Sequence, residues 1–228
     1  MRRPDARTVW LFDLDNTLHD AGSQVFGELT QAMRAYTQQA LQVDADEAMR
    51  LNLLYWQRYG ATLLGLQRHH GVNAAHFLHH THRLPGLEAR VRGHRADLQA
   101  LARLPGRKFI LSNAPRAYAL RVLGVLGIAA LFDGVLAIED MAMFGQLRPK
   151  PDARMLRRMA VRLRVRPHCC VLVEDTLVHQ KAARRVGMGT VWMQRFARRS
   201  ATGLSPARWS MRPAYVDRRL RTLRLLGR

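Results

Sequence analysis

The chain has 228 residues, enough for one or two domains with a buried core. Apolar residues make up 48% of it and charged residues 24%, which excludes extensive disorder. No stretch reaches the ~18–20 apolar residues of a membrane span, and the first residues show no apolar signal-peptide segment. The two cysteines, Cys169 and Cys170, are adjacent and cannot build a disulfide framework, so we expect a reducing, cytoplasmic location.

The formal charge is +20, from 37 basic and 17 acidic residues, and all the basic residues except Lys108, Lys150 and Lys181 are arginines. Such a charge permits binding of polyanions. The arginines are spread along the chain, however, and neither RNA-module signatures nor basic runs interleaved with aromatic residues occur. We interpret the charge as a solvated surface that also attracts small anions. We favour the same interpretation for the tail, residues 195–228, with ten arginines and one acid. Binding of a polyanion by this tail is the alternative that stays open.

Short apolar runs alternate with helical patterns over most of the chain. The runs predict buried strands at 8–12, 109–111, 135–138, 171–173 and 190–193. The helical patterns between them lie at 96–104, 117–126, 153–163 and 179–186. In the tail we expect a last strand at 213–216 and a terminal helix at 218–226. This alternation predicts a Rossmann-like α/β fold, with a parallel sheet covered by helices on both faces.

One segment interrupts this alternation after the first strand. Residues 21–92 carry helical spacing and almost no strand signal, with predicted helices at 26–41, 45–59, 62–70 and 74–80. We therefore expect two parts. Residues 1–20 and 93–228 form the α/β core, and residues 21–92 form a helical lobe inserted into it.

Polar side chains follow the predicted strands at the points where they end. Asp13 and Asp15 follow the first strand, Ser112 and Asn113 the second, and Glu174 and Asp175 the fourth. In open α/β sheets ligands bind at the carboxyl ends of the strands, so we expect these side chains to gather there together with Lys150. Clustered carboxylates without cysteine or histidine suit Mg²⁺. A lysine and a hydroxyl beside that cation suit a phosphoryl group.

Two aspartates separated by one residue, just past a strand, can divide the work of phosphoryl transfer. Asp13 can attack phosphorus and form an aspartyl-phosphate. Asp15 can protonate the leaving alkoxide and then activate the water that hydrolyses the intermediate.

The ordered set of these motifs resembles the haloacid dehalogenase-like hydrolase superfamily. Residues 12–18, FDLDNTL, resemble its first motif, Ser112-Asn113 its second, Lys150 its third and Glu174-Asp175 its fourth. The resemblance implies a Rossmann-like core, and it places a mobile helical cap where the insertion lies. Asp15 argues against dehalogenation, because dehalogenases of this superfamily lack that second aspartate.

Further tracts look like the pyrimidine 5′-nucleotidase branch of the superfamily, which removes phosphate from UMP- and CMP-like nucleotides. These tracts are YGATL at 59–63, LPGRK at 104–108, SNAPR at 112–116, AIEDM at 137–141 and VEDTL at 173–177. The resemblance implies a Mg²⁺-dependent phosphomonoester hydrolase. Two other readings stay open: a phosphatase or phosphomutase acting on another small metabolite, and an arginine-rich nucleic-acid-binding protein with a vestigial phosphatase site.

Carried over by position, the resemblance makes Asp13 the nucleophile and Asp15 the acid/base. Mg²⁺ would be held by the carboxylates of Asp13 and Asp175 and by the backbone carbonyl of Asp15. Ser112 and Lys150 would bind phosphate, helped by the backbone or side chain of Asn113. Glu174 would orient water around the metal. At position 179 similar sequences usually have asparagine, and we expect His179 to be a tolerated replacement beside the site.

The insertion supplies the candidates for substrate recognition. Tyr55, Trp56, Gln57 and Tyr59 lie where a cap helix can face the active site, and their rings can either pack in the cap or stack on a pyrimidine base. Six histidines, at 69, 70, 76, 79, 80 and 82, cluster in the same segment. His76 and His80 have a metal-capable spacing, but no neighbouring carboxylate or cysteine completes a site, so we interpret the cluster as surface histidines.

Overall fold

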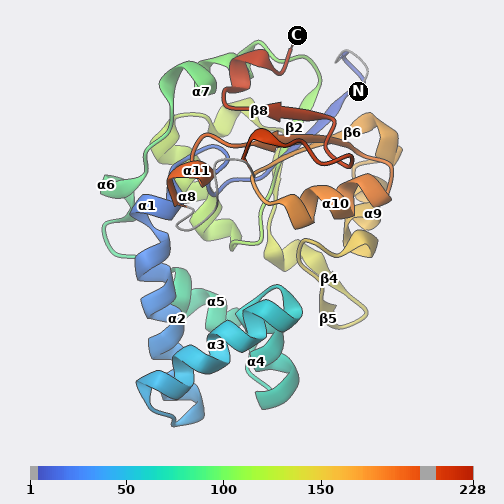
Figure 1. Cartoon of the computed structure of the whole chain (residues 1–228). Helices are drawn as coiled ribbons and strands as arrows, with labels where there is room; N and C mark the ends of the chain where they lie inside the picture. Colours follow the sequence, from blue (N-terminus) through green and yellow to red (C-terminus); the bar gives the residue numbers. More distant parts are fainter. Residues whose placement is uncertain (1–4, 201–208, 228) are drawn as a thin grey trace.

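The centre of the computed structural model, which describes residues 5–200 and 209–227, is a six-stranded parallel sheet (Figure 1). Its strand order is β3-β2-β1-β6-β7-β8. The strands are β1 (Val9–Phe12), β2 (Arg107–Leu111), β3 (Gly134–Leu136), β6 (Cys170–Glu174), β7 (Gly189–Met193) and β8 (Arg218–Leu220). The first strand of the chain is thus central, with β2 and β6 as neighbours. This arrangement confirms the predicted α/β class with a parallel sheet.

Helices cover both faces of the sheet because the central strands are apolar on both sides. Trp10 and Phe12 point into the layer that holds α7 (Arg95–Ala102) and α8 (Arg116–Leu126). Leu11 points to the opposite layer, which holds α9 (Ala153–Arg162) and α10 (Leu177–Arg185). The predicted core helices are confirmed, with boundary shifts of a few residues. The predicted strands at 8–12, 109–111, 135–138, 171–173 and 190–193 are confirmed as β1, β2, β3, β6 and β7.

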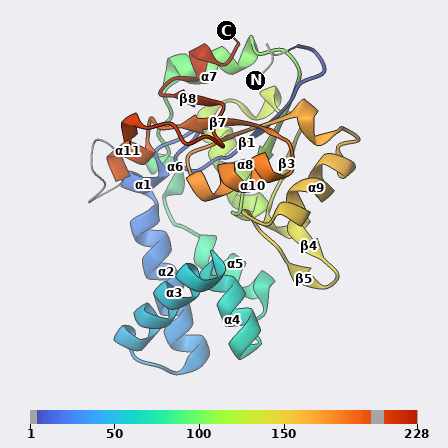
Figure 2. The same cartoon turned by 45° about the vertical axis from the view of Figure 1, so that its right-hand side comes forward.

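The residues between β1 and α7 are helical, and the longest helices form a separate layer below the sheet in both views (Figures 1 and 2). The helices are α1 (Ala21–Gln24), α2 (Phe26–Leu41), α3 (Ala45–Tyr59), α4 (Thr62–His70), α5 (Ala74–His82) and α6 (Leu87–Arg90). The predicted helices 26–41, 45–59 and 62–70 are confirmed, and α5 runs two residues beyond its predicted end. The side chains of Asp44 and Asn73 cap the first turns of α3 and α5.

This helical layer has a small apolar core of its own. It is built from Leu51 and Tyr55 of α3, Leu63 and Leu66 of α4, and Phe77 and Leu78 of α5. Ile138, from the α/β part, packs into the same cluster. The helical layer therefore has an apolar cluster of its own, and this cluster also contacts the α/β part just after β3.

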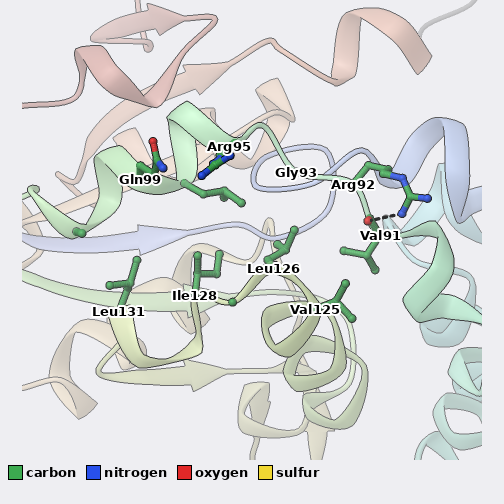
Figure 3. A pocket seen from close by; sticks show the side chains of 12 residues that line it. Val91, Arg92, Gly93, Arg95, Gln99, Val125, Leu126, Ile128 and Leu131 are labelled. Carbon is green, nitrogen blue, oxygen red and sulfur yellow. Dashed lines mark hydrogen bonds between the residues drawn. The ribbon is translucent and has the colours of Figure 1, made fainter.

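The two chain segments that join the helical layer to the sheet run side by side. The Asp20 amide donates to the Arg92 carbonyl at 2.8 Å, and His19 forms an isolated antiparallel bridge with Gly93. A cavity of about 490 Å³ lies beside the second segment, walled by Val91 to Gly93 and by apolar side chains including Leu126 (Figure 3). The two connections therefore behave as one paired linker.

The prediction for the C-terminal tail was wrong. Residues 213–216 are not a strand; β8 begins at Arg218, pairs parallel to β7 and buries Leu220. The predicted helix 218–226 is reduced to one 3₁₀ turn, Leu223–Leu225, since Leu223 and Leu226 pack on the core beside α7. The guanidinium of Arg218 donates to carbonyls of that turn, so it serves the fold. Residues 201–208 of the tail lie outside the described residues.

The structure also bears on two expectations from the sequence, the absence of a membrane span and the packing role of the cysteines. In the described part of the chain, no helix is long and apolar enough to cross a membrane. Cys169 and Cys170 are both free thiols, and burial raises the pKa of Cys170 to about 12. A buried thiol of that kind is unreactive, which agrees with a packing role for Cys170.

The close approach of α3 and α4 yields a stability prediction. The Cα of Gly65, in α4, lies against the ring of Tyr55, so that a Cβ at position 65 would overlap the ring. Gly65→Ala should lower the free energy of unfolding by about 1–3 kcal/mol through overpacking. Gly124→Ala, on the exposed side of α8, is the matched control, because an added Cβ would meet no neighbouring atom within 4 Å; it should gain up to about 1 kcal/mol. Urea denaturation of both variants measures this, and a stabilising Gly65→Ala would contradict the packing.

Candidate active site

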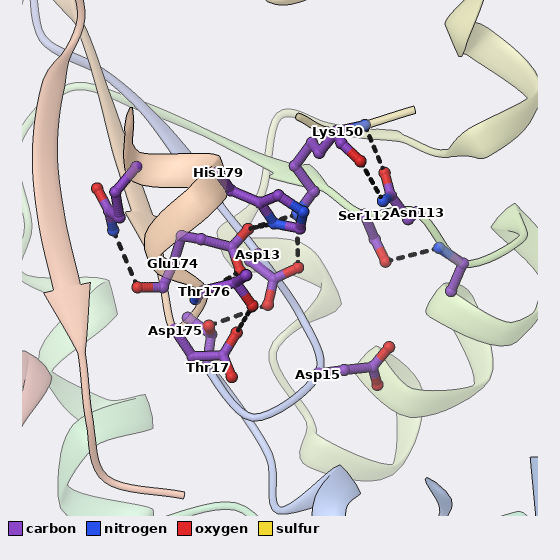
Figure 4. Close-up of polar contacts among 12 residues, drawn as sticks. Asp13, Asp15, Thr17, Ser112, Asn113, Lys150, Glu174, Asp175, Thr176 and His179 are labelled. Carbon is purple, nitrogen blue, oxygen red and sulfur yellow. Dashed lines mark hydrogen bonds and ion pairs between the residues drawn. The ribbon is translucent and has the colours of Figure 1, made fainter. Parts of the chain in front are cut away.

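The carboxyl ends of three neighbouring strands bring the predicted polar side chains together. Asp13 follows β1, Ser112 follows β2, and Glu174 and Asp175 stand at the end of β6 (Figure 4). The parallel register places Phe12 beside Val173, so the two acidic segments start level with each other. The Asp13 amide also donates to the Val173 carbonyl at 2.9 Å, which extends the strand pairing into the site.

Lys150 lies between two of the carboxylates. Its Nζ donates to Asp13 Oδ1 and to Glu174 Oε2, both at 2.7 Å. The side chains of Lys150 and Glu174 are each only 1% exposed, so this ion pair is almost fully withdrawn from water. Burial alone would lower the pKa of Lys150, but the negative charges of Asp13 and Glu174 outweigh it and raise that pKa. Lys150 is therefore a permanent buried cation in direct contact with Asp13.

Asn113 holds the backbone of Lys150 with both ends of its amide. Its Nδ2 donates to the Lys150 carbonyl at 3.0 Å, and its Oδ1 accepts from the Lys150 amide at 2.9 Å. The Asn113 side chain is thus occupied in positioning Lys150. Ser112 is buried nearby, and its Oγ accepts the Ala114 amide at 3.0 Å, which leaves the hydroxyl hydrogen to donate into the site.

The second oxygen of Asp13 is also bound. Thr17 Oγ1 donates to Asp13 Oδ2 at 3.0 Å, so each carboxylate oxygen accepts one hydrogen bond from a fixed neighbour. These two bonds fix the plane of the Asp13 carboxylate. A carboxylate held in this way is preorganised for attack on an electrophile in front of it.

Asp13, Glu174 and Asp175 form an acidic cluster, with one carboxylate oxygen from each within 4.8 Å of the others. Burial and the charge of Glu174 raise the pKa of Asp13 to about 6, although Lys150 opposes the rise. The same two causes raise the pKa of Asp175 well above its usual range. Three carboxylates facing one ammonium leave excess negative charge, and their hard oxygen donors match Mg²⁺. The residues therefore fit this cation, with the carboxylates of Asp13 and Asp175 as its candidate ligands.

Glu174 is bound on both oxygens. Oε2 contacts Lys150 and lies 3.1 Å from His179 Nδ1, and Oε1 accepts the Thr176 amide at 3.2 Å. Burial would raise its pKa, but the Lys150 ammonium and His179 outweigh burial and lower it. His179 thus lies beside the acidic cluster, in contact with Glu174. Its expected role as a tolerated replacement stays a prediction.

Asp175 is held from its main chain as well as from its side chain. Thr176 Oγ1 donates to Asp175 Oδ1 at 3.0 Å, and Trp192 Nε1 donates to the Asp175 carbonyl at 2.8 Å. Trp192 stacks on Trp209 with ring centroids 5.6 Å apart. The end of β7 and the segment before β8 therefore support the loop that carries Asp175.

The carboxylate of Asp15 points away from the acidic cluster (Figure 4). Its Oδ1 accepts from Tyr118 OH at 2.7 Å and lies 2.8 Å from His19 Nε2. Burial would raise the pKa of Asp15, but the hydrogen bonds from His19 and Tyr118 outweigh it and lower the pKa. The two aspartates thus have different environments, with the pKa of Asp13 raised and that of Asp15 lowered.

The four predicted cap residues have different surroundings. Tyr55 is 6% exposed in the core of the helical layer and stacks on His69, whereas Trp56 is 60% exposed. Gln57, beside it on α3, is exposed as well. Tyr59 lines a cavity of about 750 Å³ together with Gln67 and Arg68 of α4 and with the segment Gly145–Leu147.

That segment belongs to the small hairpin of β4 (Ala142–Met143) and β5 (Gln146–Leu147), just before Lys150. Gly60, next to Tyr59, faces Pro151: a Cβ at position 60 would lie 3.7 Å from Pro151 Cδ. The cavity therefore adjoins the loop that carries Lys150. Tyr59 is the predicted cap residue that lines it.

The histidines of the cluster lie in different surroundings in the structure. The rings of His76 and His80 are tilted by 47° with centroids 4.2 Å apart, and Tyr36 OH contacts His76 Nδ1. Among the described residues, the acidic cluster is the one group of three or more metal-capable side chains that come close enough to share an ion. His82 is different: its half-buried ring meets that of Tyr118 edge-on, and desolvation lowers its pKa to about 4.

Three contributors were not singled out from the sequence. Thr17 lies inside the first motif, four residues after Asp13, and His19 lies four residues after Asp15, so both could have been found by that spacing. Tyr118 lies 103 residues from Asp15 in the chain, and no local pattern connects the two.

The acidic cluster yields a metal-binding prediction. Mg²⁺ should raise the melting temperature by about 5–10 °C at 100 times its Kd, because a ligand that binds only the folded state stabilises it, and EDTA should reverse the shift. Asp175→Asn should remove most of the shift. Asp46→Asn, at an exposed acid in the first turn of α3, is the control and should keep it. An undiminished shift in Asp175→Asn, measured by differential scanning fluorimetry, would place the ion elsewhere.

Comparison with known proteins agrees with the sheet topology. Residues 8–187 match the family of haloacid dehalogenase-like hydrolases. Phosphate metabolism protein 8 of Saccharomyces cerevisiae is 27% identical over 202 residues, and the match covers 82% of this chain but only 62% of that protein.

Solved structures that share the fold include phosphatases and dehalogenases. CbbY from Rhodobacter sphaeroides, in complex with phosphate, has a TM-score of 0.64 at 23% identity over 96% of both chains. The HAD phosphatase from Thermococcus onnurineus has a TM-score of 0.59 at 22% identity, covering 95% of this chain and 94% of its own. The L-2-haloacid dehalogenase from Xanthobacter autotrophicus has a TM-score of 0.58 at 16% identity over 96% of both chains. These TM-scores establish the fold, and the family match over residues 8–187 shows that the chain belongs to the haloacid dehalogenase-like hydrolases.

Proposed function

We propose that the protein is a Mg²⁺-dependent phosphomonoester hydrolase that works through an aspartyl-phosphate on Asp13. The observation that carries the proposal is the contact of Asp13 with Lys150 and Thr17, beside a cluster of two further carboxylates. A carboxylate held by a buried ammonium suits attack on a phosphoryl group, whose negative charge the same ammonium can stabilise. The comparison with Phosphate metabolism protein 8 supports this choice.

In the first step an oxygen of Asp13 attacks phosphorus in line with the leaving oxygen. The bond between phosphorus and the ester oxygen breaks, and the leaving oxygen takes a proton from Asp15. Lys150 and the hydroxyl of Ser112 contact the phosphoryl oxygens. Mg²⁺, held by Asp13, Asp175 and the carbonyl of Asp15, would supply charge compensation between the carboxylates and the phosphoryl group.

In the second step a water attacks the phosphorus of the aspartyl-phosphate. Asp15, now ionised, takes the proton of this water, and the bond between phosphorus and the Asp13 oxygen breaks. Phosphate leaves, and both aspartates return to their starting states. Glu174 and His179 keep Lys150 in place throughout.

Substrate choice is assigned to the helical layer, which we propose acts as a cap (21–92) over the core (1–20 and 93–228). The core contacts are common to any phosphate monoester, so discrimination needs groups near the leaving part of the substrate. We propose pyrimidine nucleoside monophosphates. The cavity beside the Lys150 loop offers the ring of Tyr59 and the amide of Gln67, which suit stacking and hydrogen bonding to a flat base.

Phosphate release from a panel of monophosphates, with Mg²⁺ and with EDTA, tests the proposed reaction. Asp13→Asn should lower kcat at least about 10³-fold, because it removes the nucleophile while keeping the shape of the side chain. The Asp46→Asn control should keep full activity. Circular dichroism checks that Asp13→Asn is folded, and phosphate release at the wild-type rate by that variant would rule out the covalent route.

The base-binding role of the cavity has its own test. Tyr59→Ala should lower kcat/KM for UMP or CMP about 5- to 150-fold, the kinetic equivalent of the ~1–3 kcal/mol that stacking on a base contributes. Hydrolysis of p-nitrophenyl phosphate, which has no base, should fall much less. Trp56→Ala, on the exposed side of α3, is the matched aromatic control. Equal losses on both substrates in Tyr59→Ala would mean that the ring supports the fold rather than the base.

A further inference from the structure

We propose that His19 and Tyr118 are positioning residues for the acid/base aspartate: together they hold one oxygen of Asp15, Oδ1, so that the other, Oδ2, faces the leaving group. The inference rests on the proposed function and goes beyond it, because it assigns the orientation of Asp15 to two side chains outside the motifs. Both act through Asp15, and neither belongs to the groups proposed above to hold phosphate or Mg²⁺.

The geometry is asymmetric between the two carboxylate oxygens. Tyr118 OH donates to Oδ1 at 2.7 Å, and His19 Nε2 lies 2.8 Å from the same atom. Oδ2 has no hydrogen-bond partner among the described residues. When Asp15 is protonated, Oδ2 is therefore the oxygen that carries the proton, because Oδ1 already accepts two hydrogen bonds. The donors thus select the oxygen that exchanges protons with the substrate.

Both donors are themselves rigid. His19 is fully buried and Tyr118 is 3% exposed, so neither can turn to solvent. Burial raises the pKa of Tyr118, as do the nearby charge of Asp15 and the hydrogen bond to it, so the phenol keeps the proton that it donates. Among the described residues His19 Nδ1 has no hydrogen-bond partner, so the contact of Nε2 with Asp15 is the side-chain polar contact that fixes the imidazole.

A further neighbour of Asp15 is His82, from the end of α5. Its ring meets that of Tyr118 edge-on at 5.8 Å, and its lowered pKa keeps it neutral at physiological pH. It fills the space beside the Tyr118 ring without adding charge. The side chains near Asp15 thus include groups from three places: the first linker segment (His19), α8 (Tyr118) and the helical layer (His82).

His19 also belongs to the paired linker that joins the two layers. Its backbone bridges both Asp15 and Gly93, and the next residue, Asp20, bonds to Arg92. His19 therefore contacts the Asp15 carboxylate with its side chain and belongs with its backbone to the segments that join the helical layer to the sheet. The distance from Oδ1 to Nε2 is set by backbone pairing, which is the rigid support that a catalytic carboxylate needs.

The test uses the leaving group as the readout. An alkyl oxygen needs a proton from Asp15 as it departs, whereas p-nitrophenolate leaves without one. In Tyr118→Phe and in His19→Leu, kcat for UMP should fall about 10- to 100-fold with little change in KM, a part of the 10²–10⁴-fold that general acid catalysis contributes. The first-turnover release of p-nitrophenolate from p-nitrophenyl phosphate should fall less than about threefold. His19→Gln, which restores an N–H donor, should recover most of the UMP activity.

Tyr36→Phe is the matched control, because it also removes a tyrosine hydroxyl that contacts a histidine, His76, but in the exposed helical layer. It should leave both reactions unchanged. Equal losses on UMP and on p-nitrophenyl phosphate, or failure of His19→Gln to exceed His19→Leu, would overturn the positioning role. Wild-type protein that releases no p-nitrophenolate in its first turnover would overturn the proposed function as well.

Discussion

The buried ammonium of Lys150 makes the active-site edge of the sheet possible. Three carboxylates, from Asp13, Glu174 and Asp175, meet there in a largely buried space, and without a counter-charge they would repel one another strongly. Lys150 compensates one of these charges and contacts two of the groups at 2.7 Å. Burial and the remaining negative charge together raise the pKa of Asp13 and of Asp175, and a divalent cation would compensate that charge.

Much of the surrounding fold serves to hold this ion pair. The Asn113 amide clasps the main chain of Lys150, Thr17 and Lys150 fix the carboxylate of Asp13, and Trp192 supports the carbonyl of Asp175. These supports come from loops after different strands, so the parallel register of β1, β2, β6 and β7 is what aligns them. The helical layer is inserted a few residues after Asp15, which places its linker within hydrogen-bond distance of the same carboxylate.

The sequence predicted the site residues that lie in short motifs beside strands, because strand ends are set by hydrophobic patterning. Asp13, Glu174 and Lys150 were identified in this way, and the structure brings them together. Tyr118 could not be identified, since its contact with Asp15 depends on how α8 packs against the sheet. The strand in the tail was misplaced for a related reason: Arg218 and Arg219 do not look like strand residues, and pairing with β7 decided their conformation.

The central claim is that the phosphoryl group is transferred first to the carboxylate of Asp13 and then to water. The stereochemistry at phosphorus tests this claim directly. Two successive in-line displacements, first by Asp13 and then by water, invert phosphorus twice. Hydrolysis of a monoester made chiral with oxygen isotopes and sulfur, in isotopically labelled water, should therefore proceed with net retention of configuration. Net inversion would mean that water attacks the ester directly, and it would contradict the assignment of Asp13 as the nucleophile.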